Sequence, residues 1–331
     1  MRDRGIMTEE VEEPLDRAKV VVAEVIADSA IETLAASYEV DVAVDADRDE
    51  LMTRLGDAAA LVVRSATQVD AEMIAAAPNL VVIGRAGIGV DNIDVDAATD
   101  RGILVVNAPD ANTISAAEHT MALLLAQARR IPEADASLRA GRWDRSRLQG
   151  TELYGKTLGI LGLGRIGAMV AERAAAFGMR IVAHDPYIGD EQAAGLGVQL
   201  VGLDELLAES DFLTIHMPRT TETEGLIGAD AFDKMKEGVR IINAARGGIV
   251  DEEALAAAVA EGVVAGAAVD VYAVEPTTQS PLFELAEVVV TPHLGASTRE
   301  AQDRAGASVA ASVASALRGE PVPNGVNLKR M

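Results

Sequence analysis

The sequence contains no cysteine, which excludes disulfide bonds, thiolate metal sites and cysteine nucleophiles. It also lacks any run near the roughly 18 consecutive apolar residues that a membrane-spanning helix requires. The first residues, MRDRGIMTEEVEEP, are too charged for a secretory signal peptide. We therefore expect a cytoplasmic protein without membrane association or bound metal, whose chemistry depends on other side chains.

Positive charge is also scarce. The 331 residues include 29 Lys and Arg against 52 Asp and Glu, which gives a net charge of −23. Nucleic-acid binding needs a basic face that neutralises phosphates, so no nucleic-acid partner is expected. The overall field repels anions, and an anionic substrate would have to be held by a local group of arginines. The low lysine content fits salt adaptation and coding bias equally well.

Hydrophobic residues make up 49% of the chain, enough for two buried cores. Short β-branched runs alternate with segments rich in Ala, Glu and Leu, a pattern typical of parallel sheets covered by helices on both faces. A first series of runs lies at 20–25, 40–44, 60–65, 80–87 and 103–109. A second series lies at 157–164, 180–185, 211–217, 239–245, 267–272 and 288–293. The sequence therefore predicts two doubly wound α/β domains.

Two long helices are predicted at 113–130, between the two series, and at about 298–317, after the last strand. If these helices cross between domains, the chain returns at its end to the first domain. We therefore predict a discontinuous domain of residues 1–110 and 300–331, with residues 111–299 forming the second domain. The cleft between the domains is the expected ligand site, and the final PVPNGVNLKRM is expected to be a short tail.

The segment GLGRIG, residues 162–167, follows an apolar run and opens a predicted helix. Here Gly162 permits a tight turn, Gly164 lets the backbone approach a pyrophosphate, and Gly167 allows close packing of the helix on the strand. Asp185 ends the next predicted strand, where a ribose-binding acid is expected. An acid repels a 2′-phosphate and no arginine directly follows it, so the sequence predicts NAD rather than NADP.

Three polar side chains, Arg246, Glu275 and His293, each follow a predicted strand of the second series. The carboxyl ends of parallel strands meet at one edge of a sheet, so these side chains can converge where ligands bind. Arginine binds a carboxylate through two parallel hydrogen bonds, and histidine exchanges a hydroxyl proton near neutral pH. A glutamate bonded to that histidine would fix its ring. Each residue also has an interpretation without a catalytic role. Arg246 could form a surface ion pair, Glu275 could be an acid in a turn, and His293 could be a loop residue.

The other three histidines are weaker candidates for proton exchange. His119 falls within a predicted helix, where a packed or half-exposed side chain is expected. His184 precedes the proposed ribose acid and is expected to border an adenine pocket, and His216 is expected to line the cofactor cleft.

The sequence resembles the D-isomer-specific 2-hydroxyacid dehydrogenases, above all the members that oxidise 3-phospho-D-glycerate. The similarity runs from about Val20 to Asn327 and includes VVRSAT, GRAGIGVDN, GTELYGKTLGILGLGRIG, NAARGGIVDE and TPHLGAST. It implies a Rossmann-type NAD domain inserted into a smaller, flavodoxin-like substrate-binding domain. It further implies that His293 is the acid/base, that Glu275 is its partner, and that Arg246 binds the carboxylate and carbonyl of the substrate.

The resemblance also implies a set of NAD contacts at the strand ends of the second domain. The expected positions are Gly162, Gly164, Arg165, Ile166, Gly167, Asp185, Met217, Pro218, Ala244, Ala245, Asp270, Gly295 and Ala296.

The substrate contacts implied by the resemblance are arginines. Arg64 and Arg85, at the ends of first-domain strands, should bind the phosphate of the substrate. Arg145 should reach the neighbouring site across a homodimer, which could assemble further into a tetramer. The stretch 131–150, with the only tryptophan, would then belong to the subunit interface.

The implied activity is NAD-dependent oxidation of 3-phospho-D-glycerate to 3-phosphooxypyruvate, the first step of L-serine biosynthesis. One alternative is a glyoxylate or hydroxypyruvate reductase of the same family, which would not need the phosphate-binding arginines. Another is an NAD-sensing dimeric interaction protein, similar to the C-terminal-binding co-repressors. Many relatives continue into regulatory domains that bind serine, whereas this sequence ends at Met331. It is thus either naturally short or truncated, and no inhibition by serine is expected.

Overall fold

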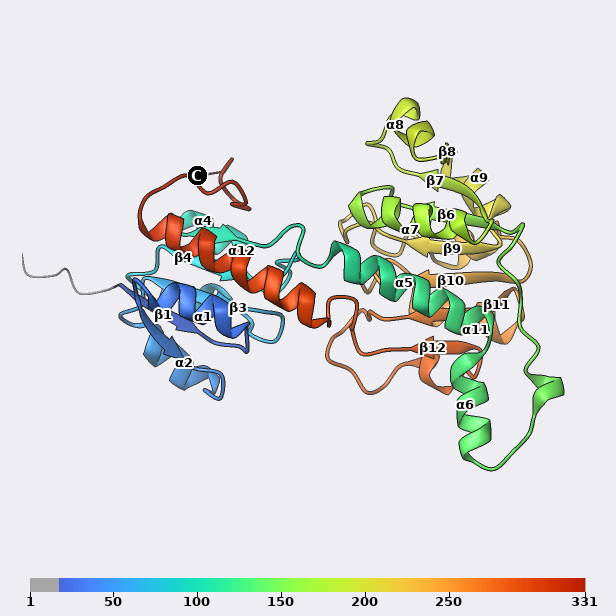
Figure 1. The fold of residues 1–331 in the computed structure, drawn as a ribbon, viewed down its shortest axis with the longest axis horizontal. Helices are drawn as coiled ribbons and strands as arrows, with labels where there is room; N and C mark the ends of the chain where they lie inside the picture. The colour runs from blue at the N-terminus through green and yellow to red at the C-terminus, as the bar shows by residue number, and fades with distance from the viewer. Residues whose placement is uncertain (1–17, 331) are drawn as a thin grey trace, which may run out of the picture. The chain divides into compact units, whose positions relative to one another are not determined.

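The computed structural model describes residues 18–330 and divides them into two compact units. One unit comprises the chain up to Asn112 together with the chain from Arg299 onward, and the other is Thr113–Thr298. In Figure 1 the blue N-terminal elements and the red α12 accordingly belong to the same unit. Each unit contains one parallel sheet, of five and seven strands, and the predicted fold class is confirmed. Within residues 18–330 no helix is long and apolar enough to span a membrane.

The discontinuous unit has the strand order β2-β1-β3-β4-β5, which is the flavodoxin-like arrangement. Its strands are β1 (Lys19–Val22), β2 (Glu39–Val42), β3 (Ala60–Val63), β4 (Val82–Arg85) and β5 (Leu104–Val106). Its helices are α1 (Asp28–Ala35), α2 (Arg48–Leu55), α3 (Ala71–Ala75), α4 (Val95–Asp100) and α12 (Arg299–Leu317).

Alternating side chains of this sheet face two separate cores. Along β1, Val20 and Val22 pack into the core beneath α1 and α12, whereas Val21 packs into the opposite core with residues of α2, α3 and α4. The α12 helix lies close to the sheet, because a Cβ on Gly84 of β4 would stand 2.6 Å from Val309. The last long helix therefore covers the first sheet, which makes the unit discontinuous.

The segment after α12 is more ordered than the short tail expected from the sequence. Asn327 is fully buried, and its side chain accepts a hydrogen bond from the Val105 amide and donates to the Ile103 carbonyl, both at 2.9 Å. Val322 also enters the core of this unit. The segment is thus an integral edge of the first unit, fixed through polar contacts that hydrophobic patterning does not reveal.

The second unit has the strand order β12-β11-β10-β9-β6-β7-β8, a Rossmann arrangement extended by β12. The strands are β6 (Thr157–Leu161), β7 (Arg180–His184), β8 (Gln199–Leu200), β9 (Phe212–Ile215), β10 (Val239–Asn243), β11 (Val264–Val269) and β12 (Val288–Val290). The helices are α5 (Thr113–Ala128), α6 (Ile131–Arg139), α7 (Arg165–Ala176), α8 (Asp190–Gly195), α9 (Leu203–Glu209), α10 (Ala229–Phe232) and α11 (Glu252–Ala260), with short 3-10 helices η1 (Arg145–Arg147) and η2 (Pro281–Glu284). Each run predicted as a strand forms one; the short β8 was not predicted.

Two cores also cover the second sheet. Ile160 and Phe212 share one core with residues of α5 and α7, whereas Leu161 and Leu213 share the other with residues of α9, α10 and α11. Buried β-branched and aliphatic strands covered on both faces are typical of parallel sheets. The carboxyl ends of these strands carry the polar loops that form the candidate site.

Candidate active site

The glycine loop connects β6 to the N-terminus of α7. Gly162 has φ of +95°, and a Cβ there would stand 2.7 Å from the carbonyl oxygen of His216. A Cβ on Gly167 would stand 2.2 Å from the Gly162 carbonyl oxygen, so this helix can pack on the strand only with glycine at that position. Around Gly164 no atom lies within 4 Å of an added Cβ. The loop is therefore close-packed on its inner side and open at Gly164, a form that fits a pyrophosphate at the helix N-terminus.

Asp185 follows β7 and is held against this loop. Its carboxylate accepts hydrogen bonds from the Leu163 amide at 2.8 Å and from the Tyr187 amide at 2.9 Å. Both bonds orient the carboxylate at the carboxyl end of β7. The position fits the ribose-binding acid that the sequence predicts.

The histidines beside the cofactor loop differ in environment. The Nδ1 atom of His184 lies 3.1 Å from the Val201 carbonyl oxygen. Burial lowers the pKa of His216 to about 3, and its Nε2 lies 2.9 Å from the Thr214 hydroxyl. His216 is therefore neutral at physiological pH and is not suited to proton exchange there.

The remaining expected NAD positions follow five strands that are consecutive in the sheet. Arg165 and Ile166 begin α7, and the strands β6, β9, β10, β11 and β12 are consecutive in the sheet. Segments at their carboxyl ends therefore share one edge of the sheet. They contain Met217, Pro218, Ala244, Ala245, Asp270, Gly295 and Ala296.

His293 and Glu275 are in direct contact. The Nδ1 atom of His293 lies 2.5 Å from Oε2 of Glu275, and the other glutamate oxygen accepts the Tyr272 amide at 2.8 Å. Burial alone would raise the pKa of Glu275, but the hydrogen bonds from His293 and Tyr272 outweigh it, so this pKa lies below its ordinary value. The charged carboxylate therefore accepts a hydrogen bond from Nδ1–H, which leaves Nε2 of the imidazole for a substrate.

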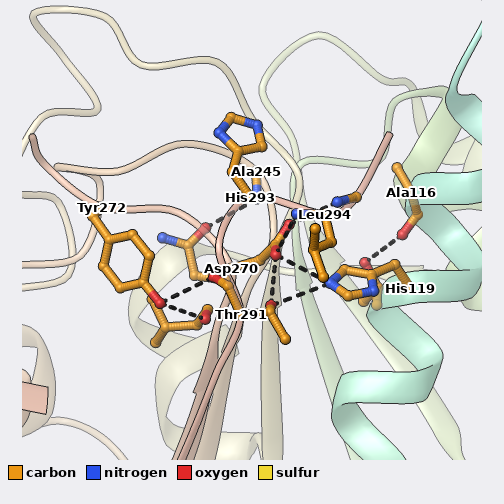
Figure 2. A network of polar contacts seen from close by, with 12 residues as sticks. Ala116, His119, Ala245, Asp270, Tyr272, Thr291, His293 and Leu294 are labelled. Carbon is orange, nitrogen blue, oxygen red and sulfur yellow. Dashed lines mark hydrogen bonds and ion pairs between the residues drawn. The ribbon is translucent and has the colours of Figure 1, made fainter. Parts of the chain in front are cut away.

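Asp270 holds the backbone around His293, as Figure 2 shows. Its side chain is fully buried. Its carboxylate accepts hydrogen bonds from the Thr291 hydroxyl at 2.5 Å, the Leu294 amide at 2.7 Å and the Gly295 amide at 2.9 Å. The imidazole of His293 projects away from this network in Figure 2. The buried Asp270 carboxylate therefore fixes the loop after β12, while the side chain of His293 in that loop remains 43% exposed.

Arg246 lies in the loop after β10, which packs tightly on the loop after β11. A Cβ on Gly247 would stand 1.8 Å from the Tyr272 carbonyl oxygen, so only glycine permits this approach. The Asn243 side chain accepts the Ala245 amide at 3.1 Å and donates to the Arg246 carbonyl at 3.0 Å. The guanidinium of Arg246 itself donates to the Ala245 carbonyl at 2.7 Å. The loops that carry Arg246 and Glu275 are thus neighbours.

Arg64 and Arg85 occupy neighbouring strand ends of the discontinuous unit. Arg85 ends β4 and pairs in register with Val63, the last residue of β3, which Arg64 follows directly. The side chains of Arg64 and Arg85 therefore begin at the same edge of this sheet.

Two residues that sequence reasoning missed clamp the loop after β3. The Glu24 carboxylate accepts the amides of Arg64 at 2.8 Å, Ala66 at 3.2 Å and Thr67 at 2.9 Å. The buried Asn92 side chain donates to the Arg64 and Thr67 carbonyls at 2.9 and 2.7 Å. The available signal was an acidic residue two positions after β1, because the ends of β1 and β3 are adjacent in the sheet.

Arg145 lies in η1 of the second unit, within the segment expected at a subunit interface. It lines a surface hollow of about 630 Å³ together with Trp143 and Arg129. Three apolar side chains of this segment are unusually exposed: Trp143 at 81%, Leu138 at 57% and Ile131 at 53%. Among residues 18–330 there is no cluster of His, Asp and Glu suited to a metal ion.

Comparison with known proteins identifies the family. The model of the D-isomer specific 2-hydroxyacid dehydrogenase NAD binding domain matches residues 121–295. The chain belongs to the D-isomer-specific 2-hydroxyacid dehydrogenases. The second unit therefore contains the NAD-binding domain of this family.

Individual relatives agree with this assignment. D-3-phosphoglycerate dehydrogenase of Mycobacterium tuberculosis is 59% identical over 309 residues, which cover 93% of this chain and 58% of that protein. The chain thus spans little more than half the length of this curated relative. Among solved structures, the TT0316 protein from Thermus thermophilus has a TM-score of 0.86 and 37% identity, covering 93% of this chain and 99% of that one. A glyoxylate reductase from Paecilomyes thermophila has a TM-score of 0.85 and 32% identity, covering 96% of this chain and 100% of that one.

Proposed function

We propose that this chain acts as a D-3-phosphoglycerate dehydrogenase, which oxidises 3-phospho-D-glycerate to 3-phosphooxypyruvate with NAD. In the cell this would be the first step of L-serine biosynthesis, in the cytoplasm. The 59% identity to the mycobacterial enzyme is the observation that carries the proposal. The two arginines at neighbouring strand ends of the discontinuous unit support it, because a dianionic phosphate needs such partners in a chain of net charge −23.

Three residues of the second unit would carry out the chemistry of this oxidation. Nε2 of His293 takes the proton of the hydroxyl group on C2, and Glu275 stabilises the imidazolium that results. Arg246 binds the substrate carboxylate and orients the reacting carbon. Arg64 and Arg85 hold the phosphate, which fixes the other end of the substrate.

The glycine loop and Asp185 would hold the dinucleotide. When bound, the nicotinamide supplies the acceptor for the hydride that leaves C2. The open side of Gly164 would accommodate the pyrophosphate, and Asp185 would accept the ribose hydroxyls. The other expected contacts at the strand ends would border the nicotinamide half.

A substrate panel with NAD, monitored by NADH absorbance, tests the proposal. We expect fast turnover of 3-phospho-D-glycerate and poor turnover of D-glycerate. Arg85→Ala and Arg64→Ala should each raise the KM for phosphoglycerate strongly, because an unpaired buried charge costs about 1–3 kcal/mol or more. Arg48→Ala, which removes a surface ion pair to Asp70, serves as the control.

Other outcomes of the panel have clear meanings. In the reverse direction with NADH as reductant, preference for glyoxylate or hydroxypyruvate over 3-phosphooxypyruvate, unaffected by Arg85→Ala, would assign the chain to the reductases of its family. NAD binding without turnover of any hydroxy acid would favour the interaction protein.

We further propose a homodimer in which Arg145 contributes to the site of the neighbouring subunit. The exposed Trp143, Leu138 and Ile131 support an interface over this segment, because three large apolar side chains within 13 residues of the sequence are exposed to solvent in the single chain. Light scattering of the purified chain tests the assembly. Mixing His293→Ala subunits with Arg145→Ala subunits tests the site: mixed dimers would contain one intact site and recover activity that both parents lack.

A further inference from the structure

One buried carboxylate holds the segment that carries the proposed acid/base. Asp270 binds Thr291, Leu294 and Gly295 through its carboxylate, and its carbonyl oxygen accepts the His293 amide at 2.8 Å. Every one of these donors lies within five consecutive residues. The conformation of this segment therefore depends on where the Asp270 side chain stands.

His119 of α5 supplies a further contact to the same carboxylate, as Figure 2 shows. Its Nε2 atom lies 3.2 Å from Oδ1 of Asp270 and 3.3 Å from the Thr291 hydroxyl oxygen. The Thr291 hydroxyl donates its single proton to Asp270, so its lone pairs are left to accept. Nε2–H of His119 can therefore donate to both oxygens. Among the described residues it is the one donor to Asp270 that comes from a helix.

The electrostatic surroundings of Asp270 make this donor important. The titratable groups near the carboxylate are His119 from α5 and Tyr272 and Glu275 from the loop after β11. The imidazole of His293 points away from it in Figure 2. Burial and the nearby Asp270 charge raise the pKa of Tyr272 to about 12, so this phenol stays neutral. His293 is bonded to Glu275 instead. Of these groups, His119 alone contacts the Asp270 carboxylate through its side chain.

The backbone of His293 needs such support. Its φ is +54°, in the left-handed region, which costs a non-glycine residue about 1–2 kcal/mol. A conformation of this kind persists only when the surrounding contacts impose it. Here the imposing contacts are the hydrogen bonds to Asp270.

We propose that His119 is a positioning residue for proton exchange at His293, acting through Asp270. This inference rests on the proposed function of His293. Without the His119 donor, the buried carboxylate loses a partner and its hold on the segment 291–295 weakens. The His293 backbone then relaxes toward a more populated conformation, and Nδ1 moves away from Glu275.

Two substitutions at position 119 test the proposal. His119→Leu removes the donor and keeps a bulky side chain, whereas the amide of His119→Gln can still donate from the position of Nε2. For His119→Leu we expect a kcat lower by about 10²-fold, typical of a displaced catalytic group. NADH binding should weaken much less than kcat, because Gly295 is only one of many expected NAD contacts, and the acidic limb of the pH profile of kcat/KM should move. His119→Gln should recover most of the turnover. If the leucine variant does not fold, His119→Asn replaces it, because the shorter side chain cannot bring its amide to the position of Nε2.

A spectroscopic measurement separates this inference from the proposed function. The chain has four histidines, so ¹⁵N-histidine NMR resolves each imidazole. His293 should show a proton on Nδ1 in the wild type and in His119→Gln, and a mixture of tautomers in His119→Leu. Absence of phosphoglycerate turnover in the wild type would reject the proposed function but leave this spectrum informative. Unchanged His293 signals and kcat in His119→Leu, or equal losses in the leucine and glutamine variants, would overturn the inference.

Discussion

The Nδ1 atom of His293 lies 2.5 Å from Oε2 of Glu275, across the ends of two neighbouring strands. The main chain fixes both partners, because the Tyr272 amide binds the glutamate and the Asp270 carbonyl accepts the His293 amide. This pairing assigns the two ring nitrogens different tasks: Nδ1 faces the carboxylate and Nε2 is left for the substrate. Several expectations depend on that division.

Substitution His293→Ala should abolish most of the activity. A positioned general base contributes about 10²- to 10⁴-fold in rate, so kcat should fall by that order. The glycine loop and Asp185 are untouched, and NADH binding measured by fluorescence should therefore remain as in the wild type. Wild-type turnover in this variant would remove His293 from the mechanism.

The charge of Glu275 should contribute to stability in a pH-dependent way. Because its pKa is lowered in the folded chain, the stabilisation is present above the ordinary carboxyl range and is lost as the pH falls through the lowered value. Thermal unfolding of wild type and Glu275→Gln should therefore differ most near neutral pH and converge in acid. A difference that stays constant with pH would mean that the charge of Glu275 is not involved.

Asp185 should determine the choice of dinucleotide. Hydrogen bonds to a charged carboxylate contribute roughly 1.5–3 kcal/mol, so Asp185→Ala should weaken NADH binding by about 10- to 100-fold. Discrimination against NADPH should decrease, since the negative charge that repels its 2′-phosphate is gone. Asp185→Asn, which keeps an acceptor for the Leu163 amide, controls for the loop. Equal binding of NADH and NADPH, unaffected by either substitution, would contradict the assignment.

The clamp at Glu24 should matter for the phosphorylated substrate. Glu24→Ala leaves three loop amides without their partner, and a misplaced Arg64 should lower kcat/KM for phosphoglycerate on the order of 10- to 100-fold. Glu24→Gln keeps an acceptor oxygen and should lose less. Glu32→Ala, at an exposed position of the neighbouring α1, is the matched control. NADH binding should not change in any of the three.

Asn327 should contribute strongly to the stability of the discontinuous unit. Asn327→Leu leaves the buried Val105 amide and Ile103 carbonyl unpaired, and each unsatisfied group costs about 1–3 kcal/mol. Urea denaturation should show a loss of several kcal/mol in this variant. Lys329→Ala, at an exposed position two residues later, should leave the midpoint unchanged. Equal midpoints for both variants would show that the segment is not needed for stability.

The sequence predicted the strands well because parallel strands covered on both faces must be almost wholly apolar. The runs at 60–65 and 157–164 illustrate this: β3 and β6 are buried throughout, and each ends where polar loop residues begin. The two-residue β8 carries too little hydrophobic pattern to be recognised. The final segment was misjudged for a related reason, since a buried asparagine, main-chain hydrogen bonds and one buried valine attach it rather than an apolar run.

The sequence by itself determined the α/β class, the family and the order of the motifs that place Arg246, Glu275 and His293 after consecutive strands. These features are local: the class and the order of the motifs follow from hydrophobic period, glycine position and residue type, and the family follows from the resemblance of the motifs. Only the tertiary structure decided which polar atoms meet. His119 and Asp270 are separated by 151 positions, and Glu24 and Thr67 by 43, yet each pair is joined by a hydrogen bond or ion pair. Such contacts depend on strand order and on the packing of helices against the sheet, which no local pattern in the sequence encodes.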